Sequence, residues 1–502
     1  MPAQLTTRAQ VNGYRFLLRR LDHALVRRDV RMLHDPMRAQ SRSLISGAIL
    51  ALLVVAGCAI LAFIKPQGSI GDANIVVGKD SGALYVVIRD KSDKSKMTLH
   101  PALNLASARL IAESADSPKS VKDSKLDSVA RGPMLGIPGA PGSLPGSDQG
   151  DRSRWTLCDT VQLSATGGSA STTGSTTTAI AGGLELGDRI KQAENGTAIL
   201  ATKENKTYLI YDGKKAEVDP QNAIMKDALG LSGVRARPIS TGLLDAAVSV
   251  PVLSAPSIPQ AGQPGPGRLS GVPVGGVIKV TGLDNSADPE LYVVLADGRQ
   301  RISPFTATVI RNENSQGMSE IKPVTPDLLA SVPVVKSLPV DDFPIAPPRI
   351  ITAEDNPVAC IAWAREAGFG RSSSDAAEGP TDRATVNLLV GTRLPLSDKA
   401  VPVSLASTDT TGDRIDAVYV PPASGEFVRV TGVEPGSQRR DTLFYVTDTG
   451  IRYGIDDLET AKILGLGTSP RLAPWAIIGE LVPGPTLSKA EAQVQHDVLP
   501  TK

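Results

Sequence analysis

The feature that most constrains this chain is an uncharged apolar run of 21 residues, LISGAILALLVVAGCAILAFI, from Leu44 to Ile64. As an α-helix this run spans about 32 Å, the thickness of one bilayer core. The pentapeptide VVAGC within it, Val54 to Cys58, also fits a lipoprotein cleavage signal. Such signals have a short basic region and polar sequence after the cysteine, whereas here AILAFI continues the apolar run. We therefore predict a retained transmembrane helix at 44–64, with lipidation of Cys58 as the alternative.

Charge is distributed unequally on the two sides of this run. Residues 1–43 hold nine arginines, no lysine and three aspartates, whereas residues 65–502 hold 44 basic and 49 acidic residues. Because cationic flanks stay in the cytoplasm, we expect an inner-membrane protein with a cytoplasmic N-terminus and a periplasmic part at 65–502. The net negative charge of the large part argues against nucleic-acid binding.

The sequence before the apolar run predicts a basic amphipathic helix. Thr7-x-x-Gln10 is a capping-box pattern, and apolar residues follow at helical spacing. The apolar positions are Val11, Tyr14, Leu17, Leu18, Leu21 and Leu25, and the arginines, mostly on other faces, are Arg15, Arg19, Arg20, Arg27 and Arg28. Such a helix can lie on anionic lipid or dock its apolar stripe into a partner. Asp35-Pro36 predicts the start of a second helix that continues into the membrane.

One pattern recurs in the part after the membrane run. An aromatic-bearing apolar strand leads into a turn, a second strand and a short helical stretch. The four copies begin at Leu84, Thr207, Leu291 and Leu443. The turn is Asp-Gly in two copies and Thr-Gly in one, which is typical of β-hairpins. Units this small bury little surface alone, so we expect them to pack against neighbours.

Pro/Gly-rich and low-complexity stretches separate these copies and predict loops or linkers. These stretches are 131–150, 164–178 and 251–276. We predict an α+β, mostly β fold in which a discontinuous central β domain is flanked by four β-β-α repeats. The predicted boundaries are 1–43 for the cytoplasmic helix, 44–64 for the transmembrane helix, 65–120, 201–250, 287–338 and 442–492 for the repeats, 121–200 and 339–441 for the central domain, 251–286 for a linker and 493–502 for a tail.

Two cysteines, Cys158 and Cys360, lie in the predicted periplasmic part, each in an apolar, strand-like run. An oxidising compartment allows them to pair. Two independent buried thiols are the alternative.

The chain shows no constellation of residues typical of catalysis. Gly78-Lys79 and Gly213-Lys214 are followed by Asp80 and Lys215, so neither dipeptide completes a phosphate-binding loop. The histidines are His23, His34, His100 and His496, and no C-x-x-C, H-x-x-x-H or G-x-S-x-G pattern occurs. Acidic pairs such as Asp341-Asp342 and Asp456-Asp457 are most often turn or helix-cap residues. We predict no catalytic residue, metal site or cofactor.

Several longer motifs resemble the EccB family, the membrane component of the actinobacterial type VII (ESX) secretion machinery. They are QVNGYRFLLRRLDHALVRRDVRMLHDP before the membrane run, KPQG after it, DSGALYV, HPALNLASARLI, RGPMLGIPGAP, WTLCDTV, VTDTGIRYGI, LAPW, PGPTLS and HDVLP. The resemblance extends from about Leu5 to Pro500. GGVIKVTG at Gly275 and the sequence from Ile415 to Pro422 are most similar to members from the fourth ESX system.

The resemblance implies a single-span inner-membrane scaffold that links a cytoplasmic motor to a periplasmic assembly. The implied partners are the motor ATPase EccC, the multispan EccD, often EccE, and a mycosin protease, with self-association in the periplasm. It also implies a disulfide between Cys158 and Cys360 and contacts from the N-terminal helix to EccC and EccD. On that helix we single out Tyr14, Leu17, Arg19, Arg20, Leu21, Arg27 and Arg28.

Two other functions follow from the same resemblance. The repeat modules resemble phage-lysin cell-wall-binding domains, which makes a peptidoglycan anchor the second hypothesis. Some family members carry an ATPase label, but this sequence lacks a phosphate-binding loop, and its large part is expected to face a compartment without ATP.

Overall fold

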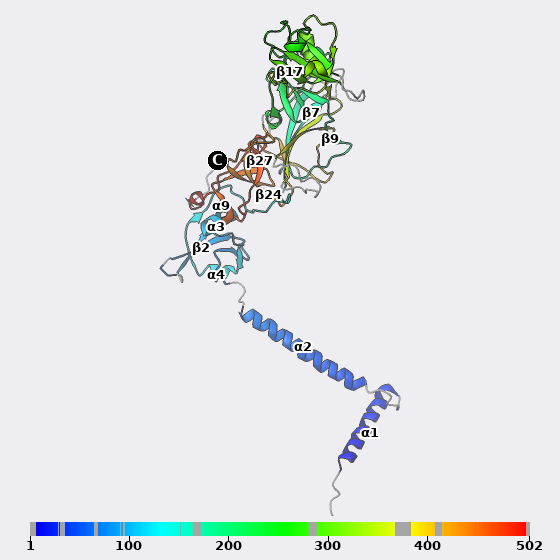
Figure 1. Ribbon diagram of the computed structural model, residues 1–502. Helices are drawn as coiled ribbons and strands as arrows, with labels where there is room; N and C mark the ends of the chain where they lie inside the picture. The colour runs from blue at the N-terminus through cyan, green and yellow to red at the C-terminus, as the bar shows by residue number, and fades with distance from the viewer. Residues whose placement is uncertain are drawn as a thin grey trace, which may run out of the picture. The chain divides into compact units, whose positions relative to one another are not determined.

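The computed structural model describes residues 7–28, 30, 36–64, 69–90, 92–93, 96–150, 152–163, 172–280, 289–366, 383–406 and 414–497. The chain divides into two compact units, residues 1–71 with 120–128, and residues 72–119 with 129–502. The described part is mostly β, as predicted, with two long helices near the N-terminus (Figure 1).

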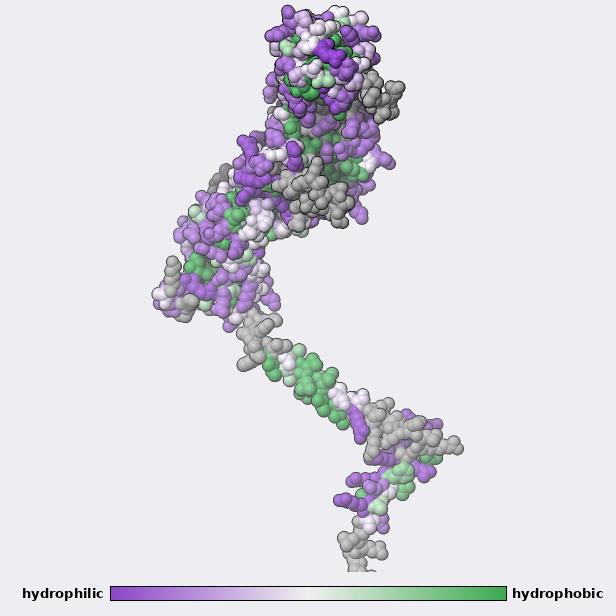
Figure 2. Space-filling view, viewed as in Figure 1, coloured by the Kyte–Doolittle hydropathy of each residue, from purple (hydrophilic) through white to green (hydrophobic). Residues whose placement is uncertain are grey.

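The two long helices belong to the first unit. α1 covers Arg8–Arg27 and α2 covers Pro36–Ile64. The start of α2 at Pro36 confirms the predicted helix restart, because proline at a first helical position lacks only an N–H that has no partner there. Ser41–Ile60 within α2 is long and apolar enough to cross a membrane, and Figure 2 shows its apolar side chains as a continuous band. The residues predicted to end this helix, 65–68, lie outside the described part.

The second unit contains a seven-stranded sheet in the order β22-β23-β8-β7-β20-β21-β9. Its strands are β7 (Arg152–Leu163), β8 (Thr172–Ala181), β9 (Ile190–Gln192), β20 (Val358–Glu366), β21 (Thr385–Gly391), β22 (Val403–Ser404) and β23 (Ala417–Tyr419). Residues 172–178 were predicted to be part of a loop, and that prediction is wrong. They form β8, because threonine is β-branched and fits a pleated strand, and β8 pairs with β7 over its full length.

The described chain also forms smaller sheets, and the order of three strands, a helix, a strand and a helix recurs in four sets along the chain. Set 1 is β1 (Ile75–Gly78), β2 (Leu84–Arg89), β3 (Met97–Pro101), α3 (Leu105–Ala112), β4 (Lys119–Val121), α4 (Asp123–Leu126) and β5 (Ala130–Arg131). Set 2 is β10 (Thr197–Lys203), β11 (Lys206–Tyr211), β12 (Lys214–Glu217), α5 (Ala223–Ala228), β13 (Arg237–Pro238), α6 (Thr241–Ala246) and β14 (Val248–Ser249). Set 3 is β15 (Val277–Val280), β16 (Glu290–Leu295), β17 (Gly298–Ile302), α7 (Pro304–Glu313), β18 (Lys322–Val324) and α8 (Pro326–Leu329). Set 4 is β24 (Gly425–Thr431), β25 (Leu443–Thr447), β26 (Ile451–Ile455), α9 (Leu458–Ile463), β27 (Arg471–Pro474), α10 (Trp475–Ile478) and β28 (Val482–Pro483).

Each set has three antiparallel strands before its first helix, whereas the sequence predicted two. The strand that the sequence analysis missed comes first in each set. After the helix, the chain returns and adds a short strand parallel to that first one in sets 2, 3 and 4. The remaining described elements are β6 (Met134–Leu135), η1 (Gly267–Leu269), β19 (Arg349–Ile350), α11 (Lys489–Ala492) and β29 (Gln495–His496).

The hairpin between β11 and β12 shows why its turn is Asp-Gly. Asp212 and Gly213 both have positive φ, 47° and 72°, which is the geometry of a two-residue type I′ turn. A Cβ on Gly213 would lie 2.2 Å from the carbonyl oxygen of Val386 in β21. Glycine is therefore required both by the turn and by the close approach of the hairpin to the central sheet.

The sets share their hydrophobic cores in pairs. Leu110 of α3 packs in one cluster with Tyr445 and Leu464 of set 4, and α3 lies beside α9 in Figure 1. A second cluster joins Leu209 of set 2 to Phe305 of set 3. Each set thus buries its apolar face against another set.

The Pro/Gly-rich stretch before β15 contributes buried side chains to these cores. Leu269 and Val272 are 2% and 3% exposed and pack with Ile278 and Val294. This part of the predicted linker is therefore packed against set 3.

A buried polar cluster holds α6 on the central sheet. Asp159 of β7 is 1% exposed, and its carboxylate accepts hydrogen bonds from Ser240 N at 2.7 Å, Ser240 Oγ at 2.8 Å and Thr177 Oγ1 at 2.9 Å. Burial raises the pKa of Asp159, and the bonds from Ser240 and Thr177 act against that shift. Burial lowers the pKa of Arg237 to about 10, and the charge of Asp159 opposes this shift. No sequence motif indicated this cluster.

We predict that Asp159→Ala lowers the free energy of unfolding by about 2–4 kcal/mol, because it leaves buried donors without an acceptor. Thermal or denaturant unfolding of the detergent-solubilised chain measures the change. Asp398→Ala is the control, since Asp398 pairs with Arg189 on the exposed surface and such pairs contribute little. Equal stability of the two variants would contradict the role given to Asp159.

Candidate functional site

α1 presents the residues that the sequence analysis singled out for a partner. Thr7 N donates to Gln10 Oε1 at 2.9 Å, so the predicted capping box begins the helix, and Arg28 follows it in the left-handed conformation. Tyr14 and Leu21 are 65% and 61% exposed. Leu17, Arg19, Arg20, Arg27 and Arg28 are exposed as well.

The spacing of these residues makes α1 two-sided. Val11, Tyr14, Leu18, Leu21 and Leu25 recur at intervals of three or four and so lie along one side of the helix. All five are exposed, so this apolar stripe is available for contact. Leaving a stripe this long in water is unfavourable, which indicates that lipid or another protein covers it.

α2 has the properties of a membrane helix beyond its apolar composition. The hydroxyl of Ser46 donates to the carbonyl oxygen of Arg42 at 2.6 Å, so this polar group is satisfied within the helix. Cys58 is an exposed free thiol on the same helix. Retention of this segment, and the alternative of lipidation at Cys58, stay predictions.

Cys158 and Cys360 form a disulfide between neighbouring strands of the central sheet. The two residues are register partners of β7 and β20, with Cα atoms 4.0 Å apart. Both are fully buried and pack with Ile180 and Leu389. The bond joins strands whose cysteines are 202 residues apart.

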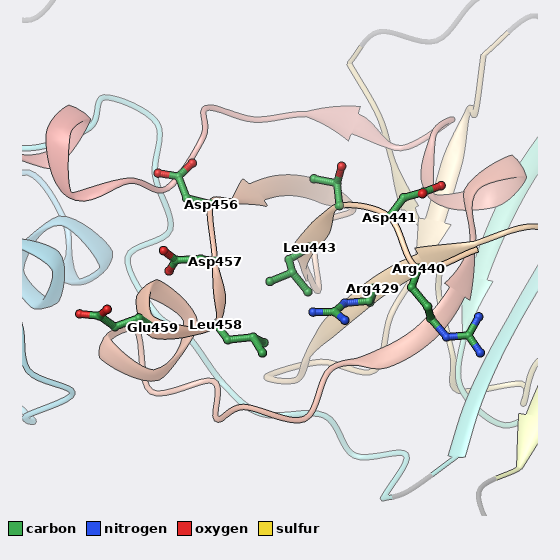
Figure 3. Close-up of a pocket in the computed structure, with 9 residues that line it drawn as sticks. Arg429, Arg440, Asp441, Leu443, Asp456, Asp457, Leu458 and Glu459 are labelled. Atoms are coloured by element: carbon green, nitrogen blue, oxygen red, sulfur yellow. The ribbon is translucent and has the colours of Figure 1, made fainter. Parts of the chain in front are cut away.

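Set 4 carries a cleft of about 630 Å³, and Figure 3 shows the side chains that line it. Its lining residues are Arg429, Arg440, Asp441, Thr442, Leu443, Asp456, Asp457, Leu458 and Glu459. Of these residues the sequence analysis named the pair Asp456-Asp457 and, as the start of a repeat copy, Leu443. It did not foresee the cleft, since pairing of β24, β25 and β26 brings these segments together.

Two of the acidic residues in this cleft serve local structure. Asp457 caps α9 by accepting from Thr460 N at 2.7 Å, and this bond lowers the pKa of its carboxyl group. Glu459 accepts from Lys489 Nζ at 3.1 Å. The helix-cap interpretation of this acidic pair is thus confirmed for Asp457. The lining of the cleft carries both acidic and basic side chains, and among the described residues it contains no imidazole, thiol or serine hydroxyl.

Other candidates for chemistry also have structural contacts. Asp342 of the second acidic pair accepts from Lys214 Nζ at 2.9 Å. His100 Nδ1 lies 3.0 Å from the carbonyl oxygen of Pro133, and His496 Nε2 lies 2.8 Å from that of Gly136. His34 lies outside the described residues. Within the described part of the chain, no group of three or more His, Cys, Asp or Glu residues is arranged to hold a metal ion.

Comparison with known proteins finds relatives along the whole chain. A family model described as type VII secretion system ESX-1, transport TM domain B, matches residues 3–501. The chain is 37% identical over 506 residues to the ESX-3 secretion system ATPase EccB3 of Mycolicibacterium smegmatis, and the match covers 99% of this chain and 92% of that protein. The predicted similarity to members of the fourth ESX system stays a prediction.

Solved structures of secretion complexes contain chains similar to this one, among them the following two. A chain of an intact ESX-5 inner membrane complex has a TM-score of 0.70 and 35% identity, with coverage of 100% of this chain and 98% of that chain. A chain of the EccB3 dimer from the ESX-3 core complex has a TM-score of 0.67 and 34% identity, with coverage of 84% and 100%.

We predict that replacing Cys158 and Cys360 together by alanine lowers the stability of the chain by about 2–5 kcal/mol, because the long loop between them is no longer closed in the unfolded state. Unfolding of the purified chain measures the loss, and faster gel migration without reductant reports the bond in the wild type. Cys58→Ser is the control and should change neither. A double variant as stable as the wild type would show that the disulfide does not stabilise the central sheet.

Proposed function

This chain belongs to the EccB family of type VII secretion systems, and on that premise we propose that it is a structural subunit of a secretion complex in the inner membrane. The single observation that carries the proposal is the family match over residues 3–501, which includes the membrane helix and the large β-rich part together. The similar chain in the intact ESX-5 inner membrane complex supports the same role.

In this proposal the chain spans the membrane once, with α1 in the cytoplasm and residues 65–502 in the periplasm. The support is the charge asymmetry, since all nine arginines of residues 1–43 precede the apolar run.

Thiol labelling tests this orientation. In a Cys58→Ser background, a membrane-impermeant maleimide is expected to label Lys399→Cys in intact spheroplasts and to label Asn12→Cys only after lysis, because both positions are exposed on the protein but lie on opposite sides of the membrane. Labelling of Asn12→Cys in intact spheroplasts would show that the N-terminus lies outside the cytoplasm and would contradict the proposed orientation.

The periplasmic part is proposed to consist of four repeat modules flanking a discontinuous central domain. The recurring element order supports this division. It also moves the starts of three modules ahead of the sequence boundaries 201, 287 and 442, to β10, β15 and β24, because each first strand pairs with the hairpin that follows it.

Attachment to the cytoplasmic motor is proposed to run through α1. Its uncovered apolar stripe supports a protein partner, and the family resemblance assigns this partner as EccC and EccD, with EccE and a mycosin protease elsewhere in the complex. Self-association in the periplasm is proposed as well, in line with the related EccB3 dimer.

We predict that Leu18→Glu reduces co-purification of EccC and EccD about tenfold or more, because it places a charge in the centre of the apolar stripe. Ala9→Glu is the matched control: Ala9 lies nine residues away, about two and a half turns, and so faces the opposite side of the helix. Pull-down from detergent-solubilised membranes measures both. Equal recovery with the two variants would contradict the tether, and membrane fractionation checks that each variant is inserted.

We propose that this chain does not hydrolyse ATP, although the relative EccB3 is named an ATPase. The support is the absence of a phosphate-binding loop from the sequence, and hydrolysis is assigned instead to EccC. Anchoring to peptidoglycan through the repeat modules remains the second candidate, and its support is the likeness of these modules to phage-lysin wall-binding domains.

A further inference from the structure

A second cleft, of about 340 Å³, lies where α6 of set 2 meets α10 of set 4. Asp245 lines this cleft from α6, Trp475 lines it from α10, and Glu480 lines it from just beyond the end of α10. Glu434 and Arg439 line it from the segment between β24 and β25. We call it the α10 cleft. Because side chains of both helices pack in the largest hydrophobic core, its walls are held in place.

Trp475 gives the α10 cleft an accessible aromatic surface. It is 47% exposed, whereas Trp155 and Trp363 are each 1% exposed. The indole ring stacks on Phe444, with the ring centroids 5.9 Å apart. A Cβ on Gly479 would lie 3.0 Å from the same ring, so glycine lets the ring lie close against the end of α10. The indole is therefore held in position while a large part of it meets solvent.

Carboxylates without partners lie in the same cleft. Glu480 is partly buried and Glu434 is exposed, and neither side chain accepts a hydrogen bond from another described residue. Burial, and then the charge of Asp245, raises the pKa of Glu480, while the charge of Arg452 acts against this shift. Both carboxylates therefore favour an incoming hydrogen-bond donor.

The other two charged side chains of the lining differ in their contacts. Asp245 pairs with Lys215 Nζ at 3.0 Å, and its side chain is still 54% exposed. The guanidinium of Arg439 is exposed and donates to no other described residue. The cleft thus offers acceptors on Glu434 and Glu480 and donors on Arg439 around one exposed aromatic ring.

These groups select against three classes of ligand. An anion would be repelled by Glu434 and Glu480. Arg452 already lies 5.2 Å from the centroid of the indole, so a second cation would meet a like charge there. A wholly apolar ligand would cover the carboxylates and leave them without donors. An uncharged ligand with one apolar face and several hydroxyl groups avoids all three costs.

We propose that the α10 cleft binds a saccharide. The C–H face of a sugar ring stacks on the indole of Trp475, and the sugar hydroxyl groups donate to Glu434 and Glu480 and accept from Arg439. This inference rests on the second candidate function, anchoring to peptidoglycan, whose glycan strands are saccharide chains. It gives that function a binding site between two of the repeat modules.

Tryptophan fluorescence of the full-length chain tests this site. Of the three tryptophans in the chain, Trp475 alone is exposed, since Trp155 and Trp363 lie in the core. The probe is chitotriose, an uncharged trimer of N-acetylglucosamine, and the detergent carries no sugar headgroup. We expect a saturable change in emission with chitotriose and none with trilysine, a cationic probe.

Isothermal titration calorimetry measures the dissociation constant for each variant. Glu480→Gln is expected to weaken chitotriose binding about fivefold, because an amide oxygen is a weaker acceptor than a carboxylate. Trp475→Ala is expected to weaken it about tenfold or more, because the stacking surface is lost. Asp456→Asn is the matched control, since Asp456 is exposed in the other cleft of set 4, and it should bind as the wild type does. Glu480→Gln keeps the shape of the side chain, and thermal unfolding checks that every variant is folded.

Lack of saturable chitotriose binding by the wild type would overturn the proposal, and so would equal affinities of the wild type, Trp475→Ala and Glu480→Gln. Saturable binding of trilysine instead would also overturn it and would assign the cleft to a basic peptide. Pelleting of the wild type with purified cell-wall sacculi tests the wall anchor separately. Chitotriose binding at this cleft without pelleting would support the saccharide site and contradict the peptidoglycan anchor.

Discussion

The pairing of β7 with β20 is the interaction on which the rest of the large unit depends. These strands come from distant parts of the chain, and their register places Cys158 opposite Cys360 on one face and Trp155 opposite Trp363 on the other. The disulfide packs in one cluster, and the two indoles, each 1% exposed, lie in the largest core. The same core includes residues of α6, α10 and β24, so sets 2 and 4 pack on the sheet that this strand pair forms.

In the N-terminal part, the environment around each helix, lipid or water, determines the structure more than packing against other parts of the chain does. α2 needs no protein partner to satisfy its backbone, since all its hydrogen bonds are internal. The apolar side chains of α1 cover only one side of the helix, so it is not a membrane span. The stripe is also too large to be left in water, so we expect it to lie against a lipid surface or another protein. An amphipathic helix thus precedes a helix that is apolar enough to cross a membrane.

The sequence predicted correctly those features that depend only on residues close together in the chain. Proline at residue 36, the capping residues of α1 and the Asp212-Gly213 turn each act through their own backbone, and each was foreseen. The first strands of the sets were missed because a four-residue strand such as Ile75–Gly78 is too short to show periodicity. The partners of Asp159, and the common cleft that Arg429 and Asp456 line, depend on segments that only the tertiary fold brings together.

The sharing of cores between set 1 and set 4 has a consequence for how the chain matures. Arg109 Nη1 donates to the carbonyl oxygen of Leu464 at 2.6 Å, across 355 residues of sequence. During export the membrane-proximal set emerges first and its partner last, so the apolar face that includes Leu110 stays open until the C-terminal strands have crossed. In a chain that ends before set 4, Leu110 therefore lacks the side chains that cover it in the complete fold, and the apolar face of set 1 stays exposed.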